Sequence, residues 1–223
     1  MFTSERALVD KLVIDLQEKY NTQYIVRELR GGNNIADIVY TTALNRDSIV
    51  FDEYFNAYYY FNEIYNKKNI TIKEIEISNS MIDKKFHNFL CELEEMGYIR
   101  IHGNYISSIK RIDAVTKNFI AVEAKLSDWK AGLEQVTRYK QYANEVYIAI
   151  SSENISKVDK GLLKNMNIGL MSVSQGKLRI PVKAKKEKVE KLDIQYYMAD
   201  KFLKQLKLAE AWKYWNEGVN LCW

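Results

Sequence analysis

A short apolar segment near the middle of the chain ends in two charged residues, and this combination constrains the fold most. Residues 119–125 read Phe-Ile-Ala-Val-Glu-Ala-Lys, a run typical of a β-strand. Because side chains alternate between the faces of a strand, Glu123 and Lys125 point to the same side, about 7 Å apart along the chain. Charges are rare in buried strands unless they are paired or used. The segment therefore predicts either a partly exposed ion pair, worth about 0–1 kcal/mol, or a functional pair.

A carboxylate that can hold a divalent cation, next to a lysine that can orient water or steady a phosphate, suits phosphodiester cleavage. Other kinds of site have little to build on. The chain has two histidines (His87 and His102), and its two cysteines (Cys91 and Cys222) show no metal-ligand spacing, so neither a zinc site nor a histidine-centred triad is expected. We expect a cytoplasmic protein without a membrane partner, because no apolar run could span a bilayer and the cysteine usage favours a reducing compartment. The net charge of +4 permits nucleic-acid binding without demanding it.

The hydrophobic pattern predicts an α/β fold that is interrupted once. The elements expected outside the interruption are helix 3–20, strands 24–29 and 35–41, strand 119–126, helix 129–143, strand 145–151, helix 156–166 and strands 169–173 and 177–182. This order predicts a mixed central sheet flanked by helices. Residues 183–191 are expected to be a charged, solvated stretch, and residues 193–215 one or two aromatic-rich helices.

The interruption has an order of elements of its own. We expect helix 52–67, a short helical stretch at 73–77, helix 80–96, and strands 98–101 and 105–109 joined as a hairpin. Helix, short helix, longer helix and hairpin is the order of a winged helix-turn-helix. The predicted organisation is a discontinuous core of residues 1–46 and 111–182, an inserted winged-helix module at 47–110, and a C-terminal helical extension at 183–223.

With the insert removed, the chain resembles the PD-(D/E)XK nuclease superfamily, also called restriction endonuclease-like. The resemblance rests on Asp37 in the second strand, on Glu123 and Lys125 of the Glu-x-Lys pattern in the third, and on Gln135 and Tyr139, which match the QxxxY pattern of several branches. It covers residues 3–175. An alanine stands before the strand acid, where the family often has proline. The resemblance implies a restriction endonuclease-like mixed sheet flanked by helices.

The same resemblance implies a Mg²⁺-dependent deoxyribonuclease, an endonuclease that hydrolyses DNA phosphodiester bonds and accepts Mn²⁺ as a substitute. Asp37 and Glu123 would be the metal ligands, with the backbone carbonyl of Ala124 as a third. Lys125 would orient the nucleophile or offset charge in the transition state. The QxxxY pair lies one helical turn apart and would contact the lysine, a metal-bound water or the DNA backbone. Without a function, the pair would be a surface glutamine and a tyrosine at the edge of the core.

The identity of the first acid stays open between two residues. Asp113 lies ten residues before Glu123, a spacing common for this motif. Asp37 fits the order of elements better, because choosing Asp113 would leave the first helix and two strands without a role.

Two glutamates are candidates for a further metal ligand, and the alternative for each is a surface charge. Glu28 lies on the strand before Asp37 and is expected to face the same side as Tyr24 and Val26. Glu5 lies on the first helix.

The inserted module is expected to position DNA or a protein partner. Its candidate DNA-binding residues are Lys84, Lys85, Asn88, Arg100, Lys110 and Arg111. Glu92, Glu94 and Glu95 make the end of its longer helix acidic, which argues against DNA contact there. Winged helices also serve as protein-protein modules, so a protein partner is the alternative. A homodimer would suit double-strand cleavage. Two other functions remain open: a catalytically silent DNA-binding or regulatory protein on a nuclease scaffold, and a nuclease subunit active only in a larger complex.

Overall fold

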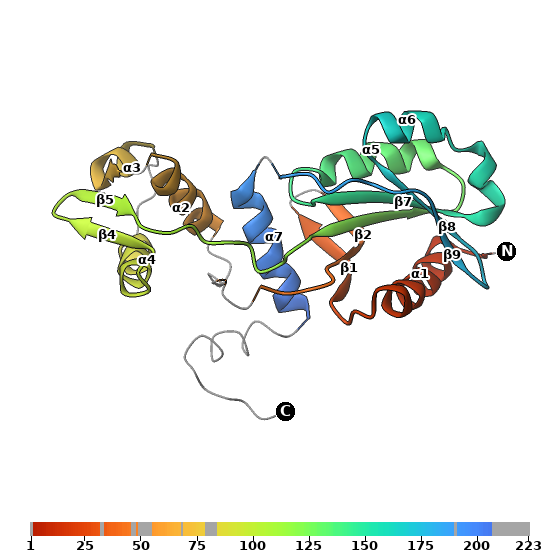
Figure 1. Cartoon of the computed structure of the whole chain (residues 1–223), viewed down its shortest axis with the longest axis horizontal. Helices are drawn as coiled ribbons and strands as arrows, with labels where there is room; N and C mark the ends of the chain where they lie inside the picture. The colour runs from red at the N-terminus through yellow and green to blue at the C-terminus, as the bar shows by residue number, and fades with distance from the viewer. Residues whose placement is uncertain are drawn as a thin grey trace, which may run out of the picture.

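The computed structural model describes residues 2–31, 34–45, 48, 55–67, 69–78, 84–189 and 191–206, without the side chains of residues 55–59, 76–78, 84 and 85. The described residues form a large lobe and a small lobe, with one helix between them (Figure 1). Among these residues, no helix combines the length and the apolar character needed to cross a membrane.

The large lobe is built on one mixed sheet. Its elements are α1 (Glu5–Tyr20), β1 (Ile25–Gly31), β2 (Asn34–Tyr40), β6 (Ile120–Lys125), α5 (Trp129–Tyr139), β7 (Glu145–Ser151), η1 (Ser152–Lys157), α6 (Lys160–Asn165), β8 (Gly169–Val173) and β9 (Leu178–Val182). The six strands lie in the order β1-β2-β6-β7-β8-β9. β6, β7 and β8 are parallel, whereas β1, β2 and β9 each pair antiparallel with their neighbours. The predicted α/β class with a mixed sheet flanked by helices is confirmed.

Helices bury both faces of this sheet, with α1 on one side and α5 and α6 on the other (Figure 1). The face of α1 that packs on the sheet consists of leucines four residues apart, namely Leu8, Leu12 and Leu16, all fully buried. Ser4 caps this helix by accepting a hydrogen bond from the backbone N–H of Ala7 at 3.1 Å. On the opposite face Val136 and Tyr139 of α5 belong to the same buried apolar cluster as Ala121 of β6. β6 is therefore covered from both sides.

The small lobe is formed by α2 (Phe55–Lys67), β3 (Asn69–Thr71), α3 (Ile72–Ser78), α4 (Lys84–Glu95), β4 (Ile99–His102) and β5 (Tyr105–Ser108). Its three strands form a separate antiparallel sheet in the order β3-β5-β4. Gly103, at φ +58°, makes the tight turn between β4 and β5. The buried face of α4 follows the three- and four-residue spacing of an amphipathic helix: Phe86, Phe89, Leu90 and Leu93.

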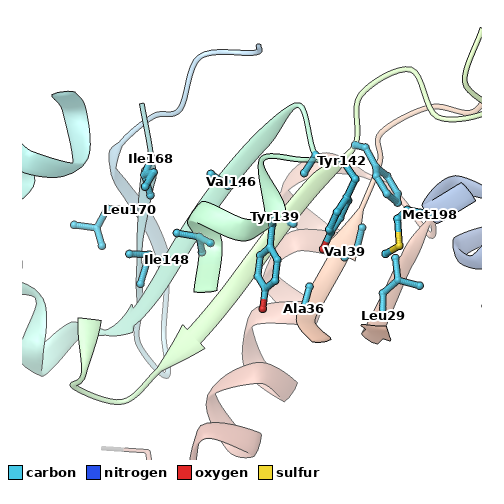
Figure 2. Packing of buried hydrophobic residues seen from close by; sticks show 14 of the residues in the cluster. Leu29, Ala36, Val39, Tyr139, Tyr142, Val146, Ile148, Ile168, Leu170 and Met198 are labelled. Carbon is cyan, nitrogen blue, oxygen red and sulfur yellow. The ribbon is translucent and has the colours of Figure 1, made fainter. Parts of the chain in front are cut away.

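The helix α7 (Leu192–Gln205) lies between the two lobes and contributes to both cores. Tyr196 packs into the apolar cluster of the small lobe. Met198 and Phe202 pack into the cluster of the large lobe, where Met198 lies beside Leu29 of β1 (Figure 2). The expected helix over residues 193–215 is thus confirmed as far as Gln205, and residues 207–223 lie outside the described part of the chain.

Two predicted helix boundaries were wrong. The helix expected over residues 129–143 ends at Tyr139. The helix expected over 156–166 is split into η1 and α6 by Val158, which is extended and buried. Asp159 then begins α6, because its carboxylate accepts the backbone N–H of Leu162 at 2.9 Å.

The charged stretch after β9, predicted to be solvated, is held to the large lobe by buried side chains and hydrogen bonds. Its lysine side chains are exposed, but Ala184 and Val189 are buried. The Asn167 amide group donates to the carbonyl of Lys185 at 2.9 Å and accepts the N–H of the same residue at 2.7 Å. The Asn144 amide group likewise donates to the carbonyl of Glu187 at 3.0 Å. Asparagine side chains thus bond this backbone as a neighbouring strand would, which charge composition alone does not reveal.

Candidate active site

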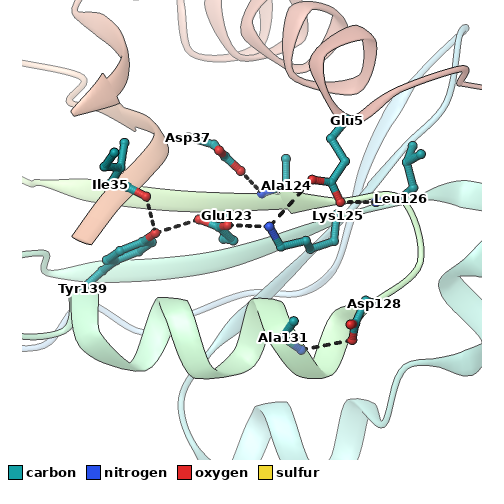
Figure 3. A network of polar contacts seen from close by, with 10 residues as sticks. All are labelled: Glu5, Ile35, Asp37, Glu123, Ala124, Lys125, Leu126, Asp128, Ala131 and Tyr139. Carbon is teal, nitrogen blue, oxygen red and sulfur yellow. Dashed lines mark hydrogen bonds and ion pairs between the residues drawn. The ribbon is translucent and has the colours of Figure 1, made fainter. Parts of the chain in front are cut away.

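Asp37 and Glu123 lie opposite each other where β2 and β6 separate. The pairing of these strands runs from Tyr40↔Ile120 to Ile38↔Val122, so the same register places Asp37 next to Glu123. Directly opposite residues of antiparallel strands share a face, and their side chains are close. Asp37 Oδ2 accepts a hydrogen bond of 2.8 Å from the backbone N–H of Ala124 (Figure 3). The structure therefore brings together the two acids that the order of elements predicted.

The carbonyl of Ala124 faces the same gap. In a strand, the N–H and the C=O of one residue point toward the same neighbouring strand. The N–H of Ala124 points to Asp37, so its carbonyl is also directed toward β2, beyond the last pair between the two strands. Two carboxylates and one carbonyl thus lie along one edge, a set of oxygen atoms of the kind that Mg²⁺ prefers.

Glu123 is held at both of its carboxylate oxygens. Oε1 pairs with Lys125 Nζ at 2.8 Å, and Oε2 lies 2.7 Å from the hydroxyl of Tyr139. The same hydroxyl lies 2.7 Å from the carbonyl of Ile35 (Figure 3). Since a hydroxyl has one proton, Tyr139 divides it between two acceptors when Glu123 is ionised, and donates it to Ile35 when Glu123 is protonated. The side chain of Glu123 is 1% exposed, so these contacts fix its position.

Burial and neighbouring carboxylates disfavour the charged form of both acids. Burial raises the pKa of Asp37, partly offset by the hydrogen bond from Ala124 and by the charge of Lys125. Burial and the neighbouring Asp37 raise the pKa of Glu123. Burial opposes the charge of Lys125, but the bond and the charge of Glu123 outweigh it, and the pKa of the lysine is raised. A cation placed between the carboxylates would offset their repulsion, so these residues fit a divalent metal.

Glu5 reaches this site from the first turn of α1. Its Oε2 lies 3.7 Å from Lys125 Nζ, and its Oε1 accepts the N–H of Leu126 at 3.4 Å. These contacts place Glu5 at the lysine and at the end of β6. Sequence reasoning proposed a metal-ligand role for Glu5 but did not foresee this ion pair.

The two residues of the QxxxY pattern have different surroundings. Tyr139 is buried and contacts Glu123, and burial together with that carboxylate raises the pKa of its hydroxyl, which therefore stays a donor. Gln135 is half-buried on α5, and no hydrogen bond of its side chain is found among the described residues. The partners of Tyr139 are thus an acid and a backbone carbonyl, whereas the sequence had pointed to Lys125, a metal-bound water or DNA.

The rival acid lies elsewhere. Asp113 is exposed, in the irregular connection between β5 and β6, and its backbone carbonyl accepts a hydrogen bond from Ser48. Its charge acts on Tyr196 of α7. Of the two acids left open by the sequence, Asp37 is the one that the structure places at Glu123.

The position of Glu28 differs from the prediction. Glu28 is exposed, whereas Val26 is buried, so the two side chains do not share a face as expected. The reason is a backbone φ of 52°, which interrupts the alternation of β1. Glu28 nevertheless lies opposite Asp37 in the register of β1 and β2, and its charge contributes to the raised pKa of Asp37.

The predicted DNA-binding residues of the small lobe fall into three groups. Asn88 and Arg100 are exposed, on α4 and β4. The ammonium of Lys110 lies 4.1 Å from the ring centroid of Tyr98, and Arg111 lies over the ring of Tyr65 at 5.6 Å, so both stems take part in packing. The two remaining candidates, Lys84 and Lys85, begin α4, and their side chains lie outside the described part of the structure.

Within the described ranges, no group of three or more histidine, cysteine, aspartate or glutamate side chains is arranged to hold a metal ion. No known family model matches the chain, and no curated protein matches it. A solved protein of unknown function from Silicibacter pomeroyi is similar over 47% of this chain and 68% of its own, with 15% sequence identity and a TM-score of 0.33.

Replacing Tyr139 with phenylalanine should weaken Mn²⁺ binding by about 10- to 100-fold, the usual cost of losing a group that orients a metal ligand. The ring would still fill the core, so the fold should persist. Isothermal titration with Mn²⁺ measures the effect. Tyr142→Phe, which removes a hydroxyl from the neighbouring buried ring, is the matched control and should leave the affinity unchanged. Equal affinities for the two variants would show that Tyr139 does not orient Glu123.

Proposed function

We propose that this chain is a metal-dependent deoxyribonuclease of the PD-(D/E)XK type. The observation that carries the proposal is the cluster of Asp37, Glu123 and Lys125 where the pairing of β2 with β6 ends, with the Asp37 carboxylate hydrogen-bonded to Ala124. Isolated Glu-x-Lys pairs occur often by chance. A second acid brought to the pair from 86 residues away, on the adjacent strand, is a much more specific arrangement.

The chemistry follows from these side chains. When bound, a divalent cation would polarise a phosphoryl oxygen and lower the pKa of a coordinated water. Asp37, Glu123 and the Ala124 carbonyl would hold it. Lys125 is 16% exposed, so its ammonium can meet a phosphate or an attacking water while still paired with Glu123. This positive charge would offset the negative charge that develops on the phosphoryl group.

Further support comes from the order of elements. α1, β1, β2, β6, α5 and β7 repeat the helix-strand-strand-strand-helix-strand order of the resemblance once the small lobe is set aside. In the small lobe, α2, β3, α3, α4, β4 and β5 follow the order of a winged helix, and β3 completes the sheet of the hairpin. We propose that this lobe positions DNA through Asn88 and Arg100, which are exposed.

Lys125→Ala should reduce Mg²⁺-dependent cleavage of linear and supercoiled DNA at least about 100-fold, in line with the loss of a charge-stabilising group. The matched control is Lys130→Ala, which removes an exposed lysine from the first turn of α5. Circular dichroism checks that both variants fold. Equal cleavage by wild type and Lys125→Ala would reject the proposed role. DNA binding by wild type without Mn²⁺ binding would instead favour a silent DNA-binding protein.

A further inference from the structure

Glu28 adopts a backbone conformation that residues other than glycine rarely adopt. Its φ of 52° lies in the left-handed region. The pairing of β1 with β2 keeps one register on both sides of it, from Arg27↔Ile38 to Leu29↔Ala36, which leaves Glu28 opposite Asp37. Such a conformation persists when the surrounding structure imposes it, and it often marks a functional site. This unusual backbone conformation therefore occurs directly opposite Asp37, the first acid of the site.

In both strands, the alternation of side chains between the two faces of the sheet shifts at the pair of Glu28 and Asp37. Val26 and Leu29 of β1 belong to the same buried cluster, the one that α5 covers. Val39 and Ala36 of β2 belong to it as well. Residues three apart in a regular strand would face opposite sides. The side-chain alternation therefore shifts at paired positions of the two strands, Glu28 in β1 and Asp37 in β2. We infer that the β1–β2 hairpin turns as a unit about this pair.

This turn lies where β2 leaves β6. The last pair between these strands is Ile38↔Val122, and continuing the register would place the backbone of Ala36 against Ala124. Instead, the carboxylate of Asp37 accepts the N–H of Ala124 at 2.8 Å and takes the place of a ladder partner. The departure of the hairpin thus makes room between the strands for the acid that the site needs.

We propose that Glu28 is a positioning residue: its left-handed backbone turns the β1–β2 hairpin away from β6 and so directs the Asp37 carboxylate to Ala124 and Glu123. The inference rests on the proposed function, since it concerns the same site. It assigns the role of Glu28 to the backbone and not to its carboxylate, which is exposed. Glycine and asparagine accept a positive φ, whereas a β-branched residue resists it. A backbone role predicts that glycine is tolerated at position 28 and valine is not. A carboxylate role predicts that every substitution that removes the carboxylate weakens metal binding.

The test compares Glu28→Gly, Glu28→Gln, Glu28→Ala and Glu28→Val by Mn²⁺ titration, thermal melting and DNA cleavage. Glu28→Gly and Glu28→Gln should bind Mn²⁺ within about threefold of wild type, as ordinary surface changes do, and Glu28→Gly should melt at the same temperature or higher. Glu28→Val should bind about 10- to 100-fold more weakly, the cost of misplacing a metal ligand. Glu28→Ala carries the same unbranched Cβ as glutamate and should bind Mn²⁺ as the glutamine variant does. Glu28→Thr is also β-branched and serves if the valine variant does not fold.

Three outcomes decide the matter. Loss of Mn²⁺ binding in the glycine and glutamine variants as severe as in valine would overturn the proposal and make the carboxylate a ligand. If the glycine and glutamine variants keep Mn²⁺ binding, the valine variant loses it and wild type cleaves no DNA, the positioning role is supported and the nuclease is rejected. Cleavage by wild type with equal Mn²⁺ binding across the series would reject the positioning role and keep the nuclease.

Discussion

Asp37→Asn should abolish metal-dependent cleavage and, in the absence of metal, raise the melting temperature near neutral pH. The asparagine oxygen can still accept the N–H of Ala124, so the strand geometry is kept. The negative charge that would bind the cation is lost. Metal binding supplies several kcal/mol of transition-state stabilisation, so the cleavage rate should fall at least about 1,000-fold.

The gain in stability follows from the sign of the pKa shift. Burial raises the pKa of Asp37 in the folded protein, so the unfolded chain loses this proton more readily. Ionisation therefore favours unfolding as pH rises from the ordinary aspartate range, about 3.9, toward the raised folded pKa. Above that pH window the folded protein bears the full cost of a buried, ionised carboxylate at position 37, and asparagine removes this cost. Below the window both proteins are uncharged at this position, and their melting temperatures should converge.

Calorimetric melting between pH 3 and pH 8, with and without Mg²⁺, checks both parts of this prediction. Mg²⁺ should raise the melting temperature of wild type, because it binds the folded state, and should leave that of Asp37→Asn unchanged. The matched control is Asp113→Asn, which removes the rival acid, an exposed residue in the connection before β6. Loss of cleavage in Asp113→Asn with full activity in Asp37→Asn would assign the first acid to position 113.

The parts of the site that depend on strand geometry could be predicted from the sequence. Alternation along one strand placed Glu123 and Lys125 on one side, and they form an ion pair of 2.8 Å. The order of elements favoured Asp37 over Asp113, and Asp37 is bonded to the neighbour of Glu123. Both inferences use the two-residue period and the neighbour relations of strands, which short-range patterns encode.

The parts of the site that depend on how helices and strands pack on one another could not be predicted from the sequence. Glu5 meets Lys125 because of the position of α1 on the sheet, and no local pattern sets that position. Tyr139 contacts Glu123 because α5 ends over the gap between β2 and β6. Glu28 was expected to follow the alternation of its strand, and the bend of a whole hairpin overrides this. Each of these contacts is tertiary, so residue type and spacing gave at most a candidate.

Phe202→Ala should destabilise both lobes together, at a cost of about 3–5 kcal/mol in the free energy of unfolding. The ring of Phe202 is fully buried in α7 and packs edge-to-face on Phe119, with ring centroids 5.3 Å apart. Phe119 leads directly into β6, so the cavity would lie beside the strand that carries the site. On the same helix, Tyr196 packs into the small lobe, and its hydroxyl donates to the carbonyl of Ile112.

Urea denaturation measures the loss of stability, and hydrogen exchange of the α4 amides tests whether the small lobe shares it. Because α7 completes both cores, protection in α4 should fall along with protection in β6. Tyr105→Ala is the control: this ring is 60% exposed on β5, and its loss should change stability by no more than about 0.5 kcal/mol. Unchanged exchange in α4 of Phe202→Ala would mean that the lobes unfold independently. In that case α7 would be an extension of the large lobe, whereas shared loss makes α7 the element that couples the site to the small lobe.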